Sequence, residues 1–109
     1  MKQRLGLLVI ALPIFAASPC TAAKHVPDAA AGRGLAEKWC TSCHVVSPTQ
    51  DRATSTGAPP FAAIANTNAT TATELRPFLQ TPHWRMSDLH LTRDEIADIT
   101  AYILSMRQE

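Results

Sequence analysis

The stretch Trp39-Cys40-Thr41-Ser42-Cys43-His44 places two thiols and an imidazole within a few residues of one another. A cluster of this kind can be a redox dithiol, part of a zinc site, a structural disulfide or the anchor of a covalently bound haem. The only other cysteine in the sequence is Cys20. The fold expected around the cluster decides among these four kinds of site.

The N-terminal residues have the pattern of a secretory signal peptide. Lys2 and Arg4 form a basic start, residues 5–18 are largely apolar, and residues 21–23 supply the small side chains of a cleavage site. The apolar stretch is shorter than the roughly 20 residues that span a membrane, and Pro13 interrupts it. We therefore expect residues 1–23 to be cleaved on export, which leaves residues 24–109 as one domain without stable membrane insertion.

Charge and size restrict the partners of this domain. The formal net charge of the whole chain is +1 at pH 7, and Lys2 and Arg4 belong to the leader, so no basic surface indicates nucleic acid binding. A domain this small buries only about 60% of the surface of its unfolded chain. We therefore expect a cofactor, a metal or a disulfide to complete the core.

The pattern of the domain is all-α, because no run of alternating apolar and β-branched residues is long enough for a strand. Asp28 can cap a first helix that runs directly into the cysteines. Four residues of this helix fall at helical spacing on one face: Gly32, Leu35, Ala36 and Trp39.

A second clear helix begins near the C-terminus. Thr92 and Glu95 are three residues apart, as in a capping box. One apolar stripe follows them, formed by Ile96, Ile99, Ile103 and Met106. Met106 is therefore expected to pack in the core.

The middle of the chain is less regular. Residues 47–60 are rich in Ser, Thr, Gly and Pro and are expected to form a loop, after which Pro60 can start a short helical turn over residues 61–64. A second short helix is expected over residues 73–80, with Pro77 near its start or at its break. Residues 81–91 form an irregular loop that contains Met86, and loops of this kind often contact ligands.

Three of the four kinds of site fit the cysteine cluster poorly. A redox Cys-x-x-Cys follows a strand, and here a helix precedes the cysteines. A zinc site would need His83 and His90, whose spacing lies outside the usual three to five intervening residues. A structural disulfide between Cys40 and Cys43 leaves His44 without a role.

Cys-x-x-Cys-His is the attachment sequence for c-type haem. Within one helical turn, the spacing of Cys40 and Cys43 places both sulfurs on one edge, where they can form thioethers to the two vinyl groups. The next residue, His44, can then turn its imidazole to the iron. We therefore expect one haem c, attached outside the cytoplasm through Cys40 and Cys43.

With this motif in place, the chain resembles the class I cytochromes c from about Asp28 to Met106. It has that family's order of an N-terminal helix ending in the haem motif, a proline-bearing loop, a short helix, a methionine loop and a C-terminal helix. The resemblance implies three to five helices around one covalently attached haem. It also implies that the first and last helices cross where Gly32 faces an aromatic residue, for which Tyr102 is the match.

The resemblance also implies the ligands of the iron. His44 is the proximal ligand, and a proline carbonyl after the motif accepts a hydrogen bond from its second ring nitrogen. Pro59 matches that proline best, and Pro60 is the alternative. Met86 matches the distal ligand, although Ser87 follows it where many members have proline. His83 and His90 are the alternatives to Met86.

Contacts to the haem propionates are expected from this same region. The indole N–H of Trp84 suits a carboxylate and makes it the first candidate. The guanidinium groups of Arg52 and Arg85 are weaker candidates, since surface solvation accounts for them equally well.

An iron with His44 and Met86 as axial ligands has no open position for oxygen or peroxide, so the expected function is electron transfer and not enzymatic catalysis. We expect a periplasmic carrier whose donor is a cytochrome bc complex or a dehydrogenase and whose acceptor is an oxidase or a reductase. Two alternatives stay open: a haem c subunit of a larger oxidoreductase, and a haem protein with a labile distal Met that binds small ligands.

Overall fold

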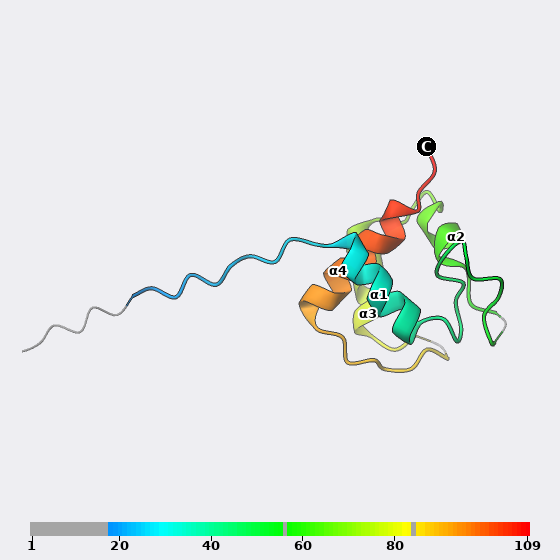
Figure 1. Ribbon diagram of the computed structural model, residues 1–109, viewed down its shortest axis with the longest axis horizontal. Coiled ribbons are helices and arrows are strands. Elements are labelled where there is room, and N and C mark those ends of the chain that lie inside the picture. The colour runs from blue at the N-terminus through cyan, green and yellow to red at the C-terminus, as the bar shows by residue number, and fades with distance from the viewer. Residues whose placement is uncertain (1–17, 56, 84) are drawn as a thin grey trace, which may run out of the picture.

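The computed structural model describes residues 18–55, 57–83 and 85–109. These residues contain four helices and no strand: α1 (Ala29–Trp39), α2 (Phe61–Ala65), α3 (Ala72–Gln80) and α4 (Arg93–Ser105). Helix α4 contacts each of the other three helices, and its contact with α1 is the most extensive (Figure 1). The prediction of an all-α fold with three to five helices is therefore confirmed.

Local capping sets where the two long helices begin. The side chain of Asp28 accepts hydrogen bonds from the backbone N–H groups of Ala30 and Ala31, at 2.8 and 3.3 Å, so α1 begins where the sequence predicts. At the start of α4, Thr92 accepts from the Glu95 N–H, and the Glu95 carboxylate accepts from the Thr92 N–H. This reciprocal pair is the predicted capping box.

Helices α1 and α4 cross in close contact at Gly32. A Cβ atom at this position would overlap the backbone carbonyl of Asp98 and would lie 2.8 Å from the Ile99 nitrogen. Only glycine lets the two backbones approach this closely. The nearest atoms to Gly32 are backbone atoms of α4 that lie one turn before Tyr102, the predicted partner. The ring of Tyr102 packs against Phe61.

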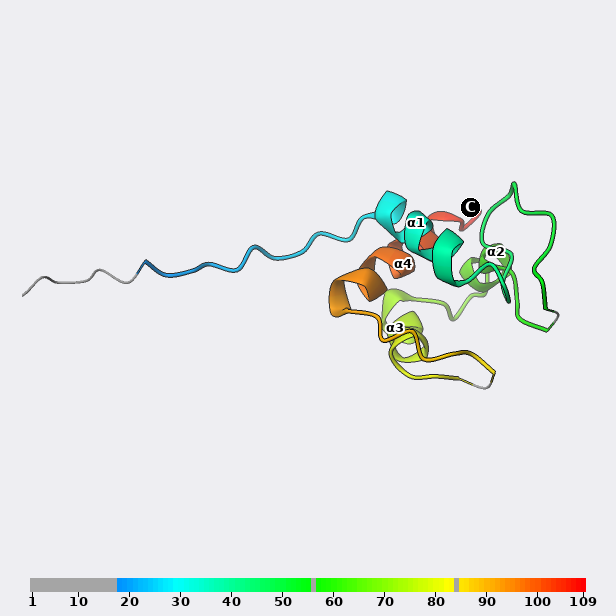
Figure 2. The same ribbon diagram turned by 60° about the horizontal axis from the view of Figure 1, so that its bottom comes forward.

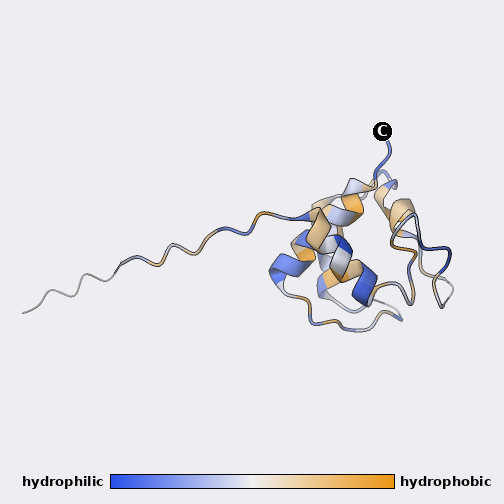
Figure 3. Cartoon of the chain, viewed as in Figure 1, coloured by the Kyte–Doolittle hydropathy of each residue, from blue (hydrophilic) through white to orange (hydrophobic). Residues whose placement is uncertain are grey.

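The core lies where α4 meets the other helices and the cysteine turn. Ile96, Ile99 and Ile103 of the predicted α4 stripe are buried, and Met106 packs against the core as expected. Figure 3 shows α2 as almost entirely hydrophobic, whereas hydrophilic residues gather on the last turn of α1 and the first turn of α4. The buried cluster comprises Ala36, Cys40, Val46, Phe61, Ala65, Leu75, Ile99, Tyr102 and Ile103.

Trp39 does not share the buried face of α1. Gly32 and Ala36 are buried, but 47% of Trp39 is exposed, and the Lys38 ammonium lies 4.7 Å from the centre of its ring. Trp39 is the last residue of α1, so its side chain lies beyond the region where α1 and α4 pack most closely.

Helix α3 differs from the expectation at Pro77, which lies in its second half and neither starts nor breaks it. Pro77 has no N–H to donate to the Thr73 carbonyl, but both residues are exposed, so water can hydrate that carbonyl. The Thr71 side chain caps the start of the helix by accepting from the Glu74 N–H. The Pro77 carbonyl accepts from the Thr81 N–H at 3.0 Å and closes the last turn.

Residues 18–27 precede α1 as an exposed segment without helical structure, and Figures 1 and 2 show its N-terminal part extending away from the helices. The predicted signal peptide covers residues 1–23, of which residues 1–17 lie outside the described residues. Among the helices described, none is both long and apolar enough to cross a membrane.

Candidate functional site

The two cysteines of the cluster lie on one turn that continues from α1. The Cys40 N–H donates to the Ala36 carbonyl, and the Cys40 carbonyl accepts from the N–H groups of both Cys43 and His44, at 3.1 and 2.8 Å. Cys40 is buried and Cys43 is partly exposed. The turn therefore brings two thiols and the following imidazole to one place at the end of α1.

The thiol of Cys40 is not positioned as a reactive redox group. Cys40 and Cys43 are both free cysteines. Burial, and secondarily the nearby Cys43, raises the pKa of Cys40 to about 11. A redox dithiol needs the opposite, a thiol whose pKa is lowered so that the thiolate forms at neutral pH.

Of the two ring nitrogens of His44, Nδ1 makes a hydrogen bond and Nε2 does not. Nδ1 lies 2.7 Å from the carbonyl oxygen of Pro59, and a carbonyl can only accept, so Nδ1 carries the proton. Of the two prolines considered, Pro59 is thus the one whose carbonyl contacts His44. In a neutral imidazole, Nε2 would then hold the lone pair that can bind a metal, and the hydrogen bond at Nδ1 would increase its basicity.

The rings of Phe61 and Tyr102 form a row of aromatic contacts that begins at His44. The Phe61 ring centre lies 5.3 Å from that of His44 and 6.4 Å from that of Tyr102, which it meets edge-on. The Tyr102 hydroxyl donates to the Val46 carbonyl at 2.7 Å. Burial raises the pKa of Tyr102, so the hydroxyl stays protonated and remains a donor.

Phe61 and the Tyr102 hydroxyl are not among the site residues that the sequence predicts. Aromatic residues of this kind occur in every core, and no motif marks the ones that contact His44. The one signal available was the position of Phe61, directly after the two adjacent prolines.

The predicted distal residue, Met86, is partly buried in the loop between α3 and α4. Its N–H donates to the His83 carbonyl at 2.7 Å, which closes a turn. Arg85 in this turn has φ of +67°, a left-handed conformation in a residue other than glycine. Trp84, the candidate for a propionate contact, lies outside the described residues.

The two histidines of the same loop are bound to different neighbours. His83 Nδ1 lies 3.0 Å from the Phe78 carbonyl, and its ring meets the Phe78 ring edge-on, which holds His83 at the end of α3. His90 is 86% exposed at its side chain and lies 3.5 Å from the Asp88 carboxylate. The other candidates for propionate contacts, Arg52 and Arg85, are both exposed.

The donor set of this region fits a covalently attached haem. It offers two thiols on one helical turn, an adjacent imidazole with a free Nε2, and a thioether on a separate loop. No group of three or more His, Cys, Asp or Glu side chains in the described ranges is arranged to hold a metal ion, so a zinc site finds no support there.

Comparison with known proteins agrees with the predicted family. The family model for cytochrome c matches residues 29–107. Cytochrome c-552 from Bradyrhizobium diazoefficiens is 41% identical to this chain over 94 residues, which cover 86% of the chain and 89% of that protein. No solved structure matches the chain. Because the family match runs from the first residue of α1 to beyond the end of α4 and includes the cysteine turn, the chain belongs to the cytochrome c family.

Proposed function

We propose that this protein is a periplasmic carrier of single electrons, with one haem c attached through Cys40 and Cys43 and ligated by His44 and Met86. Membership of the cytochrome c family supports a haem-based electron carrier. The observation that carries the proposal to these residues is the 2.7 Å contact between His44 Nδ1 and the Pro59 carbonyl. It leaves Nε2 as the ring nitrogen available to a metal, on the residue directly after Cys43.

A bound haem supplies an iron that gains and loses one electron. In this proposal two side chains of the protein would hold that iron. His44 would contribute an imidazole whose basicity is raised by Pro59, and Met86 would contribute a soft, neutral thioether that favours the ferrous state. With both side chains bound, external ligands would be excluded.

We infer the redox partners from the proposed role as an electron carrier and not from the surface charge of the protein. A donor such as a cytochrome bc complex or a dehydrogenase, and an acceptor such as an oxidase or a reductase, would bind through a small and short-lived interface. A signal peptide in residues 1–23 would direct export of the carrier to the periplasm. Residues 24–109 would form the mature domain there.

The intact mass of the protein purified from the periplasm tests the covalent attachment. We expect the mass of residues 24–109 plus one haem, and a pigment that acidified acetone does not extract. Apoprotein with a disulfide, obtained from cells able to attach haem, would contradict the proposal.

Substitution of Met86 tests the distal ligand. Met86→Ala should abolish the weak sulfur-to-iron band of the ferric protein, lower the potential and allow carbon monoxide to bind. Met106→Ala is the matched control, since it should leave spectrum and potential in place. Truncating a fully buried Met to Ala costs about 2–5 kcal/mol of stability, and the partly buried Met106 should cost less.

An unchanged spectrum and potential in Met86→Ala would show that Met86 is not the ligand. His83 would then be the next residue to substitute, because its Nδ1 contacts the Phe78 carbonyl and its Nε2 is the ring nitrogen available to a metal. Rapid binding of carbon monoxide to the native ferrous protein would instead favour a haem protein with a labile methionine.

A further inference from the structure

The side-chain amide of Gln50 bonds to the backbone on both sides of the haem-binding histidine. Its Nε2 lies 2.9 Å from the His44 carbonyl, 3.2 Å from the Thr41 carbonyl and 3.2 Å from the Arg52 carbonyl. Its Oε1 accepts a hydrogen bond from the Val46 N–H at 2.9 Å. We propose that Gln50 is the positioning residue of His44, an inference that rests on His44 being the axial ligand proposed above.

The amide of glutamine is suited to this set of partners. Its nitrogen carries two hydrogens and its oxygen accepts, so one side chain can satisfy carbonyls and an N–H group together. Thr41 lies within the cysteine turn and Val46 lies after it, so the amide links the two ends of the segment that carries His44. The Gln50 N–H donates to the Ser47 carbonyl at 3.2 Å, which turns the loop back toward this segment.

Other contacts hold the neighbouring carbonyls but not that of His44. Ser55 donates to the Ser42 carbonyl from both its N–H and its hydroxyl, at 2.9 and 3.2 Å. The Phe61 N–H donates to the Val45 carbonyl at 3.0 Å. Among the described contacts, the Gln50 amide is the donor to the carbonyl of His44 itself.

The position of the His44 backbone matters because the imidazole makes its one described hydrogen bond through Nδ1, to the Pro59 carbonyl. A shift of the backbone would lengthen the 2.7 Å contact from Nδ1 to the Pro59 carbonyl. The basicity of Nε2 depends on that contact. Loss of the Gln50 amide should therefore change both the exchange of the Nδ1 proton and the potential of the iron.

Two substitutions of Gln50 separate its donor from its acceptor. Gln50→Met keeps the length of the side chain and removes every hydrogen bond of the amide. Gln50→Glu keeps an oxygen for the Val46 N–H and loses the donors to His44 and Thr41. Thr49→Ala is the matched control in the same loop, because the hydroxyl of exposed Thr49 contacts Ser47 and not the haem-binding segment.

The measurements are proton exchange by NMR and the midpoint potential, both on the ferrous holoprotein. In Gln50→Met, the His44 Nδ1 proton and the Val46 amide should exchange faster by on the order of tenfold, since local opening then breaks fewer hydrogen bonds. In Gln50→Glu, the His44 proton should exchange faster while the Val46 amide keeps its protection. The potential should shift in both variants and stay at the wild-type value in Thr49→Ala.

Equal exchange of the His44 proton in the wild-type and either Gln50 variant would overturn the proposal. Faster exchange of the α4 amides to the same extent as His44 would also overturn it, because the residue would then support only global stability. If Gln50→Met yields no holoprotein, Gln50→Glu decides by the same criteria. Failure of the haem proposal itself is distinguishable, because it appears in the mass and spectrum of the wild-type protein.

Discussion

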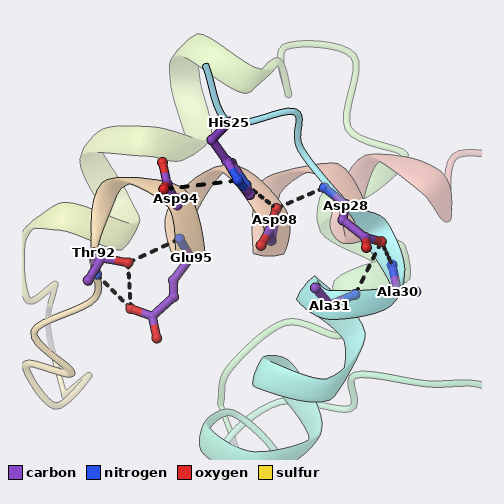
Figure 4. A network of polar contacts seen from close by, with 8 residues as sticks. All are labelled: His25, Asp28, Ala30, Ala31, Thr92, Asp94, Glu95 and Asp98. Atoms are coloured by element: carbon purple, nitrogen blue, oxygen red, sulfur yellow. Dashed lines mark hydrogen bonds and ion pairs between the residues drawn. The ribbon is translucent and has the colours of Figure 1, made fainter. Parts of the chain in front are cut away.

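Asp98 joins three parts of the chain through one buried carboxylate. Its Oδ1 accepts hydrogen bonds from His25 Nε2 at 2.7 Å and from the Asp28 N–H at 2.8 Å (Figure 4). Asp28 in turn caps α1, and the other ring nitrogen of His25 lies 4.0 Å from the Asp94 carboxylate. Through Asp98, the segment before α1 and the start of α1 are both bound to α4.

The charges of this cluster shift the pKa values of both partners. The hydrogen bond to Asp98 raises the pKa of His25 above 6.5, and the negative charges of Asp94, Asp98 and Asp28 act in the same direction against the effect of burial. Burial opposes ionisation of Asp98, but the hydrogen bonds from Asp28 and His25 and the charge of His25 together lower its pKa below 3.8.

These shifts predict a stability that depends on pH. The contribution of His25 is fully present below pH 6.5 and is lost as the pH rises through its raised folded-state pKa. The contribution of Asp98 is present above pH 3.8 and is lost as the pH falls through its lowered folded-state pKa. His25→Ala should therefore lower the Tm most between these two values, near pH 5, and progressively less toward pH 9.

Thermal unfolding of His25→Ala and wild-type holoprotein from pH 4 to pH 9 measures this difference. His90→Ala is the control, since its side chain is almost fully exposed and its contact with Asp88 lies on the surface. A Tm difference for His25→Ala that is the same at pH 5 and pH 9 would show that the ring acts by packing and not by charge.

At the scale of the elements, the crossing of α1 and α4 depends on one glycine of α1 and not on the other. A Cβ at Gly32 would overlap the Asp98 carbonyl, whereas a Cβ at Gly34 would meet no atom within 4 Å. Both residues lie inside the same helix, so their intrinsic cost to helix stability is the same. The comparison isolates the contact between the two backbones.

Substitution by alanine should therefore have opposite effects at these two positions. Gly32→Ala should destabilise the protein by about 1–3 kcal/mol or more, because the two helices must move apart. Gly34→Ala should stabilise it by about 1 kcal/mol, because alanine is the better helix former. Chemical denaturation of the two holoproteins measures both values. Similar changes in the two variants would mean that α1 and α4 do not pack closely at Gly32.

At the scale of the whole molecule, the protein chain supplies only a small core of its own. Ile99 and Val46 are the largest fully buried side chains among the described residues. Each fully buried aliphatic side chain contributes about 1.5–3 kcal/mol, and the entropy of ordering each residue opposes this by about 1–2 kcal/mol. A covalently attached haem would add apolar surface beside Cys40, which belongs to the core cluster.

We therefore expect the chain without attached haem to be largely unfolded. The double substitution Cys40→Ala and Cys43→Ala should remove most of the helical signal in circular dichroism and abolish the cooperative thermal transition. Cys20→Ala is the control, and it should match the wild-type protein because Cys20 is exposed and lies in the proposed leader. A cooperative transition in the double variant would contradict this expectation.

The sequence alone was sufficient for features that depend on neighbouring residues. The caps at Asp28 and Thr92 each act on an N–H two or three residues away, and the cysteine motif occupies a single turn. Because such contacts join residues only two to four positions apart, they leave a fixed spacing in the sequence that can be read directly. The all-α class, the starts of α1 and α4 and the family resemblance all followed from patterns of this kind.

Tertiary structure decided which distant groups meet, because contacts between residues far apart leave no periodic signal in the sequence. Pro59 and Pro60 are adjacent, and only the folded loop shows that the carbonyl of Pro59 reaches His44, 15 positions earlier. Nothing in the sequence distinguishes Gln50 from the other residues of its loop. The turn closed by the Gln50 N–H and the Ser47 carbonyl places its side-chain amide beside the His44 carbonyl. Asp98 and His25 are 73 positions apart, and they meet because the close crossing at Gly32 brings the start of α1 beside α4.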